Sequence, residues 1–350
     1  MAYTHNDLFP NVYDFENLFN AYLKARKNKR YNEDVLKFSA NLEENLIQLQ
    51  NELIYKTYEP GIYREFYVYD PKTRLVMAAP FRDRVLHHAL CNVIEPIFDR
   101  TFYYHSYACR TNKGTHSGVA CTVKYLRKIT KKHEHPYCFK ADISKYFQSI
   151  NHRILMDIIC QKIICKDTIW LIQKIVDSTA NPTDINPVGL PVGNLTSQLC
   201  ANIYLNELDK HIKHDLKCGY YIRYMDDFLI LHPDKRYLNS LWAEVKEYLN
   251  NRLALKMNQK TAIFPIDQGV DFLGYRIWPN RIIIRKGSVK RIKRIVKKFN
   301  KRRISGNISD DKIRSVLASW LGHSKRADVP KLRKIVLDAA KDMFGIEGLS

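Results

Sequence analysis

The chain has 350 residues, of which 45% are hydrophobic and 27% are charged, a composition that predicts a globular protein with a substantial core. Lysine and arginine total 57 against 36 aspartate and glutamate residues, so the formal net charge is +21 at pH 7. This excess favours a polyanionic partner, nucleic acid first of all. The sequence has no apolar run of 18 residues and no signal-type apolar segment near Met1, so we expect no membrane association and a cytoplasmic protein.

The first predicted elements are a helix, a hairpin and a second helix. Residues 34–56 form an amphipathic helix in this prediction, because apolar residues recur at steps of mainly three and four: Val35, Leu42, Leu46, Leu49 and Leu53. Residues 62–80 alternate apolar and polar side chains around Asp70 and Pro71, which indicates a β-hairpin. Residues 82–98 return to a helical pattern.

The middle of the chain predicts strands that end in acidic residues. The stretch "YCFKADISKYF" (137–147) indicates a buried strand ending at Asp142, and one or two helices follow over 152–179. A loop rich in proline and glycine then precedes a helix over 196–216. The stretch "YIRYMDDFLIL" predicts a hairpin with Asp226 and Asp227 at its tip.

The last part predicts a helix over 237–253, a strand pair within "GVDFLGYRIWPNRIIIR" and a helical tail from residue 288. Strands separated by helices, with acidic residues at strand ends, indicate an α+β fold followed by an α-helical appendix. The eight cysteines include no Cys-x-x-Cys pair and lie mostly in apolar surroundings, so we interpret them as reduced thiols in the core. The histidine pairs at 133/135 and 211/214 lack partner cysteines, which favours surface histidines over a zinc site.

The acidic residues suggest a reaction that depends on divalent metal ions. Asp142 and the Asp226–Asp227 pair would repel one another if they lay together, and divalent cations would offset that repulsion. Magnesium prefers hard carboxylate oxygens and keeps phosphate oxygens in its shell, and two such ions support in-line phosphoryl transfer. An Asp-Asp dipeptide alone more often lies on a solvated turn, so this interpretation depends on the surrounding sequence.

The surrounding sequence resembles one family. The motifs "FKADISKYFQSI", "GLPVGNLTSQLCANIYL", "YIRYMDDFLIL", "LKMNQKT" and "FLGY" occur in the order and approximate spacing of the palm motifs of reverse transcriptases. The resemblance implies a right-hand polymerase fold with fingers, a palm of antiparallel sheet and helices, and an α-helical thumb. The implied division is an N-terminal helical extension (1–60), fingers (61–136), palm (137–284, with fingers-associated helices at about 152–188) and a basic thumb (285–350).

The resemblance also implies the roles of individual residues. Two Mg²⁺ ions, for which Mn²⁺ can substitute, would be held at Asp142, Ile143, Asp226 and Asp227, with Asp227 the weaker participant. Contacts to the deoxynucleotide (dNTP) would come from Arg84, Arg110, Lys113, Phe147, Val192, Gly193, Gln198 and Lys260. Phe147 would exclude a 2′-hydroxyl, although core packing is its alternative role. Lys260 would protonate the leaving pyrophosphate, although a solvated loop lysine is an equal alternative.

The "LPVGN" motif narrows the resemblance. Most reverse transcriptases have glutamine where this chain has Val192, and proline where it has Gln198. Together with "SYACR" and "KGTH" upstream, this departure is similar to the enzymes of diversity-generating retroelements, which copy template adenines inaccurately. We therefore expect Val192 to permit low fidelity at adenine. The resemblance further implies template RNA, complementary DNA (cDNA) or primer and dNTPs as ligands, and a small basic accessory protein (the accessory variability determinant) as partner.

A basic helix closes the chain. From Arg285 to Arg303, eleven of nineteen residues are lysine or arginine and none is acidic, while apolar residues recur at helical spacing. The resemblance places this segment at the start of the thumb, with nucleic-acid contacts from Lys290, Arg291, Lys293, Arg294, Lys297 and Lys298. A solvated basic face without a ligand is the alternative interpretation.

Other functions remain compatible with the sequence. A retron, abortive-infection or group II intron-like reverse transcriptase is the main alternative, and we expect no room after the thumb for a maturase, endonuclease or ribonuclease H domain. A non-catalytic RNA-binding scaffold would need no carboxylates. An RNA-dependent RNA polymerase shares the palm motifs, but Phe147 argues against ribonucleotides.

Overall fold

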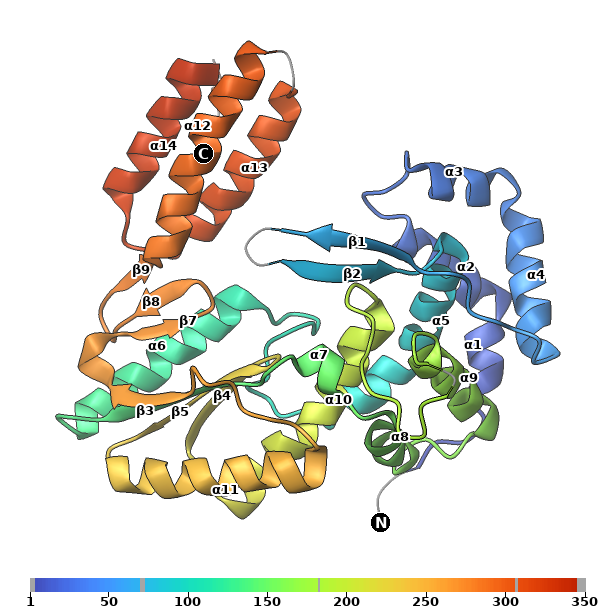
Figure 1. Cartoon of the computed structure of the whole chain (residues 1–350), viewed down its shortest axis with the longest axis horizontal. Coiled ribbons are helices and arrows are strands. Elements are labelled where there is room, and N and C mark those ends of the chain that lie inside the picture. The colour runs from blue at the N-terminus through green and yellow to red at the C-terminus, as the bar shows by residue number, and fades with distance from the viewer. Residues whose placement is uncertain (1–3, 70–72, 182, 306–307, 345–350) are drawn as a thin grey trace. The chain divides into compact units, whose positions relative to one another are not determined.

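The structure is a computed structural model that describes residues 4–69, 73–181, 183–305 and 308–344. The chain folds into two compact units, the first comprising 1–112, 141–228 and 240–261, and the second 113–140, 229–239 and 262–350. Both units contain helices and strands (Figure 1), so the predicted mixture of α and β structure is confirmed.

Helices dominate the first unit. They are α1 (Phe9–Tyr13), α2 (Phe15–Ala25), α3 (Glu33–Ala40), α4 (Leu42–Ile54), α5 (Phe81–Asp99), α7 (Tyr146–Ser149), α8 (His152–Cys160), α9 (Lys166–Asp177) and α10 (Leu195–Lys210), with a π-helical turn η1 (His211–Asp215) after α10. Helix α11 (Lys235–Leu253) begins in the second unit and ends in the first. Helix α5 packs against α2 and α10, and most residues of α10 are buried, which makes α10 the centre of this unit.

The predicted helix over 34–56 is wrong in one respect, because the chain forms two helices there. Asn41 separates α3 from α4 with φ −126° and ψ 57°, outside the helical region. The side chain of Asn45 donates to the carbonyl of Phe38 at 3.0 Å, which satisfies an acceptor at the end of α3. Asparagine has a lower helix propensity than the leucines around it, so it is a favourable place for the break.

Two sheets involve the first unit. The predicted hairpin forms as β1 (Arg64–Val68) and β2 (Arg74–Ala78), paired antiparallel from Arg64–Ala78 to Val68–Arg74. Its Asp70–Pro71 turn lies outside the described residues. A four-stranded sheet contains β3 (Tyr137–Asp142), β4 (Tyr220–Tyr224), β5 (Asp227–His232) and β6 (Ala262–Pro265), in the order β4-β5-β3-β6. The predicted strand end at Asp142 is confirmed.

The second unit holds one helix from the first half of the chain and the C-terminal elements. These are α6 (Thr115–Lys132), a 3₁₀ turn η2 (Ile266–Gln268), β7 (Val270–Phe272), β8 (Tyr275–Ile277), β9 (Ile282–Ile284), α12 (Lys286–Ile304), α13 (Asp310–Ser324) and α14 (Pro330–Phe344). The predicted strand pair near 270–285 is in fact a three-stranded sheet. A tight turn, in which the Trp278 N–H donates to the Arg281 carbonyl at 2.8 Å, returns the chain and adds β9.

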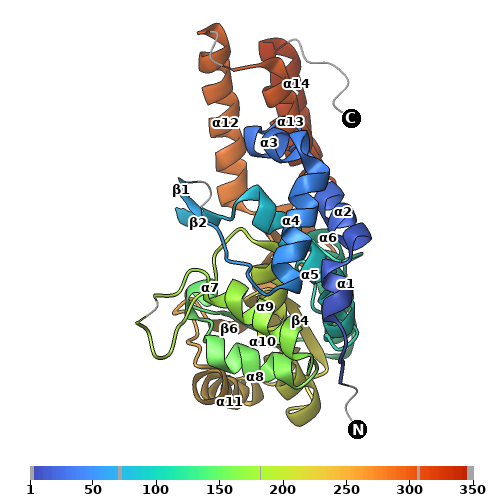
Figure 2. The same ribbon diagram turned by 90° about the vertical axis from the view of Figure 1, so that its right-hand side faces the viewer.

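The predicted helical tail forms three helices, α12 to α14, that lie side by side (Figures 1 and 2). A small apolar core joins them, made of Ile292, Val296, Ile313, Leu317, Val336 and Ala340. The helices therefore have their own hydrophobic contacts, and the polar side of α12 is left for solvent or a ligand.

Most of the cysteines lie in the core, as their apolar surroundings in the sequence indicate. All eight cysteines are free thiols; six are buried, whereas Cys109 and Cys160 are exposed. Among the described residues, no helix is long and apolar enough to cross a membrane.

Candidate active site

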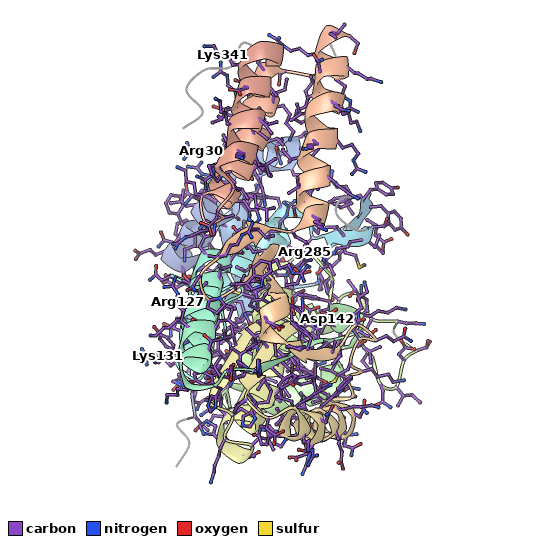
Figure 3. All side chains as sticks on the ribbon, turned by 90° about the vertical axis from the view of Figure 1, so that its left-hand side faces the viewer. Arg30, Arg127, Lys131, Asp142, Arg285 and Lys341 are labelled. Carbon is purple, nitrogen blue, oxygen red and sulfur yellow. The ribbon has the colours of Figure 1, made fainter. Side chains whose placement is uncertain are left out.

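Asp142 is the last residue of β3, and Asn258 donates hydrogen bonds to both its backbone and its side chain. Its carbonyl accepts from the Asn258 backbone N–H at 2.7 Å, and its carboxylate Oδ2 accepts from Asn258 Nδ2 at 3.1 Å. The Ser144 N–H donates to the Lys256 carbonyl at 2.8 Å, so the chain remains paired beyond the strand. The side chain of Asp142, labelled in Figure 3, is half-buried. These bonds fix the direction of its carboxylate.

Asp226 lies in the two-residue turn between β4 and β5, and Asp227 begins β5. Met225, the other turn residue, has φ +54°, a left-handed conformation that is uncommon outside glycine. Strand β5 lies next to β3 in the sheet, so the turn belongs to the strand neighbouring that of Asp142. The side chain of Asp226 is half-buried in this turn.

The Asp226 carboxylate affects the hydroxyl of Tyr146, which follows Asp142 by four residues. Burial raises the pKa of the Tyr146 hydroxyl well above its usual value, Arg223 opposes this, and the Asp226 carboxylate contributes to the rise. Tyr146 donates to the Ala201 carbonyl at 2.6 Å. The Asp226 carboxylate thus contributes to the electrostatic environment of Tyr146, in the segment that follows β3.

The acidic residues fit a magnesium site in their chemistry. Within the described ranges, no group of three or more His, Cys, Asp or Glu residues is arranged to hold a metal ion. The three aspartates therefore do not form a closed carboxylate cage. Magnesium in phosphoryl-transfer enzymes is bound through one or two carboxylates, with substrate phosphates and water completing its shell. Asp142 and Asp226 are compatible with that arrangement, and metal binding by them remains a prediction.

A buried ion pair supports the Asp226 turn, and no motif of the sequence indicated it. Arg223 and Asp209 are both fully buried, with Arg223 Nε donating to Asp209 Oδ1 at 2.7 Å and Nη2 to Oδ2 at 2.5 Å. Tyr221 also donates to Asp209, and Arg223 Nη1 donates to the Met225 carbonyl in the turn at 3.1 Å. Burial alone would lower the pKa of Arg223, but Asp209 outweighs it and the pKa is raised. The available signal was an arginine inside an otherwise apolar strand.

The loop before α6 is anchored to the same strand. The Arg223 N–H donates to the His105 carbonyl at 3.1 Å, and the Tyr107 N–H donates to the Arg223 carbonyl at 3.0 Å. Asn202 on α10 donates to the Ala108 carbonyl at 2.9 Å. The "SYAC" segment therefore supports the edge of β4.

Arg110 has its guanidinium bonded within this loop. It donates to Asp99 Oδ1 at 2.6 Å, to the Tyr103 carbonyl at 2.8 Å and to the Ser106 carbonyl at 3.2 Å, and it lies over the Phe102 ring. Only 7% of its side chain is exposed. Arg110 thus stabilises this loop, and a contact with the nucleotide, which stays a prediction, would require these donors to leave their present acceptors.

A second loop links Phe147 to the β1–β2 hairpin. The Leu190 N–H donates to the Phe147 carbonyl at 2.7 Å, and the Val192 carbonyl accepts from the Met77 N–H at 3.1 Å. Gly193 has φ +122°, and a Cβ there would lie 3.0 Å from the side chain of Val76. Of the predicted nucleotide contacts, Val192 and Gly193 therefore lie in one loop, and a backbone hydrogen bond joins that loop to Phe147.

A family model described as reverse transcriptase (RNA-dependent DNA polymerase) matches residues 69–277. This range includes the Asp142 strand, the Val192 loop and the Asp226 hairpin. The chain belongs to the reverse transcriptase family. Membership supports RNA-directed DNA polymerase activity in general.

Three proteins illustrate how far the similarity of this reverse transcriptase extends. Protein YkfC of Escherichia coli is 26% identical over 320 residues, covering 80% of this chain and 79% of YkfC. The group II intron-encoded protein LtrA of Lactococcus lactis is 24% identical over 350 residues, covering 79% of this chain and 56% of LtrA. A putative COX1/OXI3 intron 2 protein of Saccharomyces cerevisiae is 22% identical, covering 59% of this chain but only 31% of its own length.

The other predicted nucleotide contacts of this reverse transcriptase are less closely connected. Arg84 on α5 donates to the Ala79 carbonyl at 2.9 Å. Gln198 is half-buried in the first turn of α10, and Lys260 is exposed in the turn after Asn258. Lys113 belongs to the second unit. Their roles toward a nucleotide remain predictions.

The basic residues predicted to contact nucleic acid lie on one side of α12 in the second unit. All six are exposed: Lys290, Arg291, Lys293, Arg294, Lys297 and Lys298. Ile292 and Val296 face the core shared with α13 and α14. Figure 3 labels Arg285 at the start of α12 and Lys341 on α14. The reverse transcriptase thus presents a continuous cationic face on a helix that packs within its own small core.

Proposed function

We propose that this reverse transcriptase synthesises cDNA for a diversity-generating retroelement and copies template adenines with low fidelity. The polymerase chemistry is supported by family membership. The retroelement type is supported by one observation above all: a valine occupies the loop position between the Phe147 carbonyl and the β2 backbone, where most reverse transcriptases have glutamine. In this proposal residues 61–136 serve as fingers, 137–284 as palm and 285–350 as thumb.

Asp142 and Asp226 would hold two magnesium ions in the proposed mechanism, with Asp227 and Ile143 beside them. When bound, the ions make the primer 3′-hydroxyl easier to deprotonate and offset the charge of the departing pyrophosphate. Asp142 is suited to this because its backbone and Oδ2 are already fixed by hydrogen bonds. Lys260, exposed and two residues after Asn258, would supply a proton to pyrophosphate.

Phe147 would select the sugar. Its ring is half-buried, and its backbone is held by the Leu190 N–H, so the ring has a defined position at the start of the Val192 loop. An aromatic ring offers no hydrogen bond to a 2′-hydroxyl, and burying that hydroxyl without a partner is unfavourable. The proposed monomers are therefore deoxynucleotides.

Val192 would determine how strongly the enzyme discriminates against a mismatched new base pair. Its carbonyl is bonded to the Met77 N–H, which fixes the backbone, while its branched apolar side chain can neither donate nor accept a hydrogen bond. A glutamine at this position has two donors and an acceptor. A mismatched pair would lose fewer contacts against valine than against glutamine, so discrimination is weaker.

The Val192→Gln variant is expected to copy adenine more accurately. One restored hydrogen bond contributes about 1 kcal/mol, which corresponds to a fall in misincorporation at template adenine of up to about ten-fold. Sequencing of cDNA made by both enzymes from one RNA template measures this, with errors counted separately at each template base. Errors opposite the other bases should change less.

Val188→Gln is the matched control, because Val188 lies in the same loop and 54% of its surface is exposed. It should leave the error spectrum unchanged. Equal adenine error rates for the wild type and Val192→Gln would remove Val192 from the explanation of fidelity. If the wild type makes no excess errors at adenine at all, the retroelement proposal itself fails.

The cationic face of α12 would bind the template–primer backbone. Charge reversal at Lys290, Lys293 and Lys297 is expected to weaken binding equally for unrelated sequences and to reduce the dependence of log Kd on log salt by about 3, since each phosphate contact contributes a slope near 0.9. Fluorescence anisotropy with two RNA–DNA duplexes at several salt concentrations measures both effects.

A triple reversal at Lys27, Lys166 and Lys246 has the same net charge change and serves as control, because these exposed lysines lie on α2, α9 and α11, or directly beside them. Its effect on the salt dependence should be much smaller. A change of sequence preference in the α12 variant, instead of uniform weakening, would contradict a backbone role for this face.

The proposed ligands also include a template RNA, a primer or cDNA and a small basic accessory protein. Similarity to LtrA supports a second candidate function, a reverse transcriptase of the group II intron type. The two candidates differ in fidelity, since the intron type has no requirement for adenine-directed errors. Retron and abortive-infection enzymes are further alternatives, and a non-catalytic scaffold would make no cDNA in the same assay.

A further inference from the structure

Asn258 connects the strand of Asp142 to the turn that carries Lys260. Beyond β3, Ile143 and Met257 form an antiparallel bridge, and the next residue, Asn258, donates its backbone N–H to the Asp142 carbonyl at 2.7 Å. These backbone contacts alone hold Asn258 against the end of β3, independently of its side chain.

Both the NH₂ group and the oxygen of the Asn258 side-chain amide form hydrogen bonds. Nδ2 donates to Asp142 Oδ2 at 3.1 Å, and Oδ1 accepts from the Lys260 backbone N–H at 3.1 Å. The Asn258 carbonyl accepts from the Thr261 N–H at 3.0 Å, which closes the turn. Reversing the amide would place oxygen against the carboxylate and NH₂ against an N–H donor. Both neighbours therefore select the same orientation.

This arrangement constrains both the Asp142 carboxylate, proposed to bind metal, and the turn of Lys260, proposed to protonate pyrophosphate. A carboxylate that ligates a cation loses less freedom on binding if its orientation is already set by a hydrogen bond to one oxygen. The turn after Asn258 sets where the Lys260 backbone begins, and hence the region its side chain can reach. An aspartate here would place like charge against Asp142, and an apolar residue would satisfy neither neighbour.

We propose that Asn258 is a positioning residue that orients the Asp142 carboxylate for metal binding and, through the same amide, fixes the turn bearing Lys260. This inference rests on the proposed function of Asp142. It deepens that function by assigning the orientation of the carboxylate to one side-chain amide.

The test compares Asn258→Ala, Asn258→Ser and Gln259→Ala. Gln259 is exposed in the same turn and is the matched control. Serine can still accept the Lys260 N–H in a short turn but is too short to keep the bond to Asp142. Mn²⁺ binding to the protein alone is titrated by the electron paramagnetic resonance of free Mn²⁺, with Asp142→Ala as the baseline. Thermal unfolding is measured for each variant.

We expect Asn258→Ala and Asn258→Ser to bind Mn²⁺ about 10- to 100-fold more weakly than the wild type, the usual cost of losing a hydrogen bond to a metal ligand. Gln259→Ala should bind as the wild type does. Primer extension at increasing Mg²⁺ should show the half-saturating concentration rising in both Asn258 variants. Asn258→Ser should keep the thermal stability of the wild type, which separates orientation of Asp142 from folding of the turn.

Wild-type Mn²⁺ affinity and Mg²⁺ dependence in Asn258→Ser would overturn the inference. That result leaves the proposed function standing as long as Asp142→Ala is inactive. If Asp142→Ala itself extends primers normally, the proposed function fails first, and the role of Asn258 fails with it.

Discussion

Alanine at Asp142 or at Asp226 is expected to abolish DNA synthesis. Each substitution removes a carboxylate that would bind a magnesium ion, and loss of several kcal/mol of transition-state stabilisation corresponds to a rate reduction of about a thousand-fold or more. Asp227→Ala should reduce the rate less, because Asp227 begins β5 and is the weaker participant in this proposal. Primer extension on an RNA template with dNTPs under single-turnover conditions measures all three.

Folding is the necessary control for this result. Removing one of several neighbouring carboxylates relieves repulsion, so the variants should unfold at a temperature no lower than the wild type by more than a few degrees. Asp157→Ala, at an exposed aspartate on α8, should keep full activity. Activity of Asp142→Ala or Asp226→Ala within about ten-fold of the wild type would rule out the metal-binding role of that residue.

Removing the charge of Arg223 is expected to have the largest effect on stability. Arg223→Met leaves Asp209 buried without its cationic partner, and breaking a buried ion pair in this way costs about 3–5 kcal/mol. The Met225 carbonyl also loses its donor, so the Asp226 turn should lose its support. Urea unfolding of the single variants and of Arg223→Met/Asp209→Leu measures the stability and the coupling energy.

The double variant separates stability from positioning. It contains no unpaired buried charge, so it should recover much of the stability lost by Arg223→Met, yet its polymerisation rate should stay low because Met225 still lacks a donor. Lys56→Met is the matched control: the Lys56–Asp167 pair is also 2.5 Å long, but both side chains are nearly half exposed, so its loss should cost under about 1 kcal/mol. Arg223→Met costing no more than Lys56→Met would contradict a structural role for the buried pair.

The local elements were largely predictable. The strand ending at Asp142, the helix beginning near Arg82 and the hairpin with Asp226 at its tip all follow from short-range patterns of apolar residues and turn residues. The positions where a helix ends or the chain turns were less predictable. Asn41 divides a helix whose apolar spacing continues across it, and the turn between Trp278 and Arg281 adds a third strand where two were expected. In both places a local backbone preference competes with a periodic pattern, and periodicity alone does not decide the outcome.

The partners of polar side chains were not predictable. The resemblance implies a nucleotide contact for Arg110, which stays a prediction, but nothing in the sequence indicated that its donors bond to Asp99 and to loop carbonyls. Arg223 gave only a weak signal, a charge within an apolar strand, and nothing in that strand indicates Asp209 as its partner. Burial decides these pairings, because a buried charge must be matched by whichever group the packed elements bring to it.

The sequence by itself determined which residues belong to strand ends and turns, and its ordered motifs indicated the family, because both depend on neighbours along the chain. Only the tertiary structure decided that Asn258, 116 residues after Asp142, donates to that carboxylate and that an ion pair on α10 and β4 supports the Asp226 turn. Hydrogen bonds and ion pairs form between atoms a few ångströms apart, and separation along the sequence does not specify which atoms packing will bring to that distance.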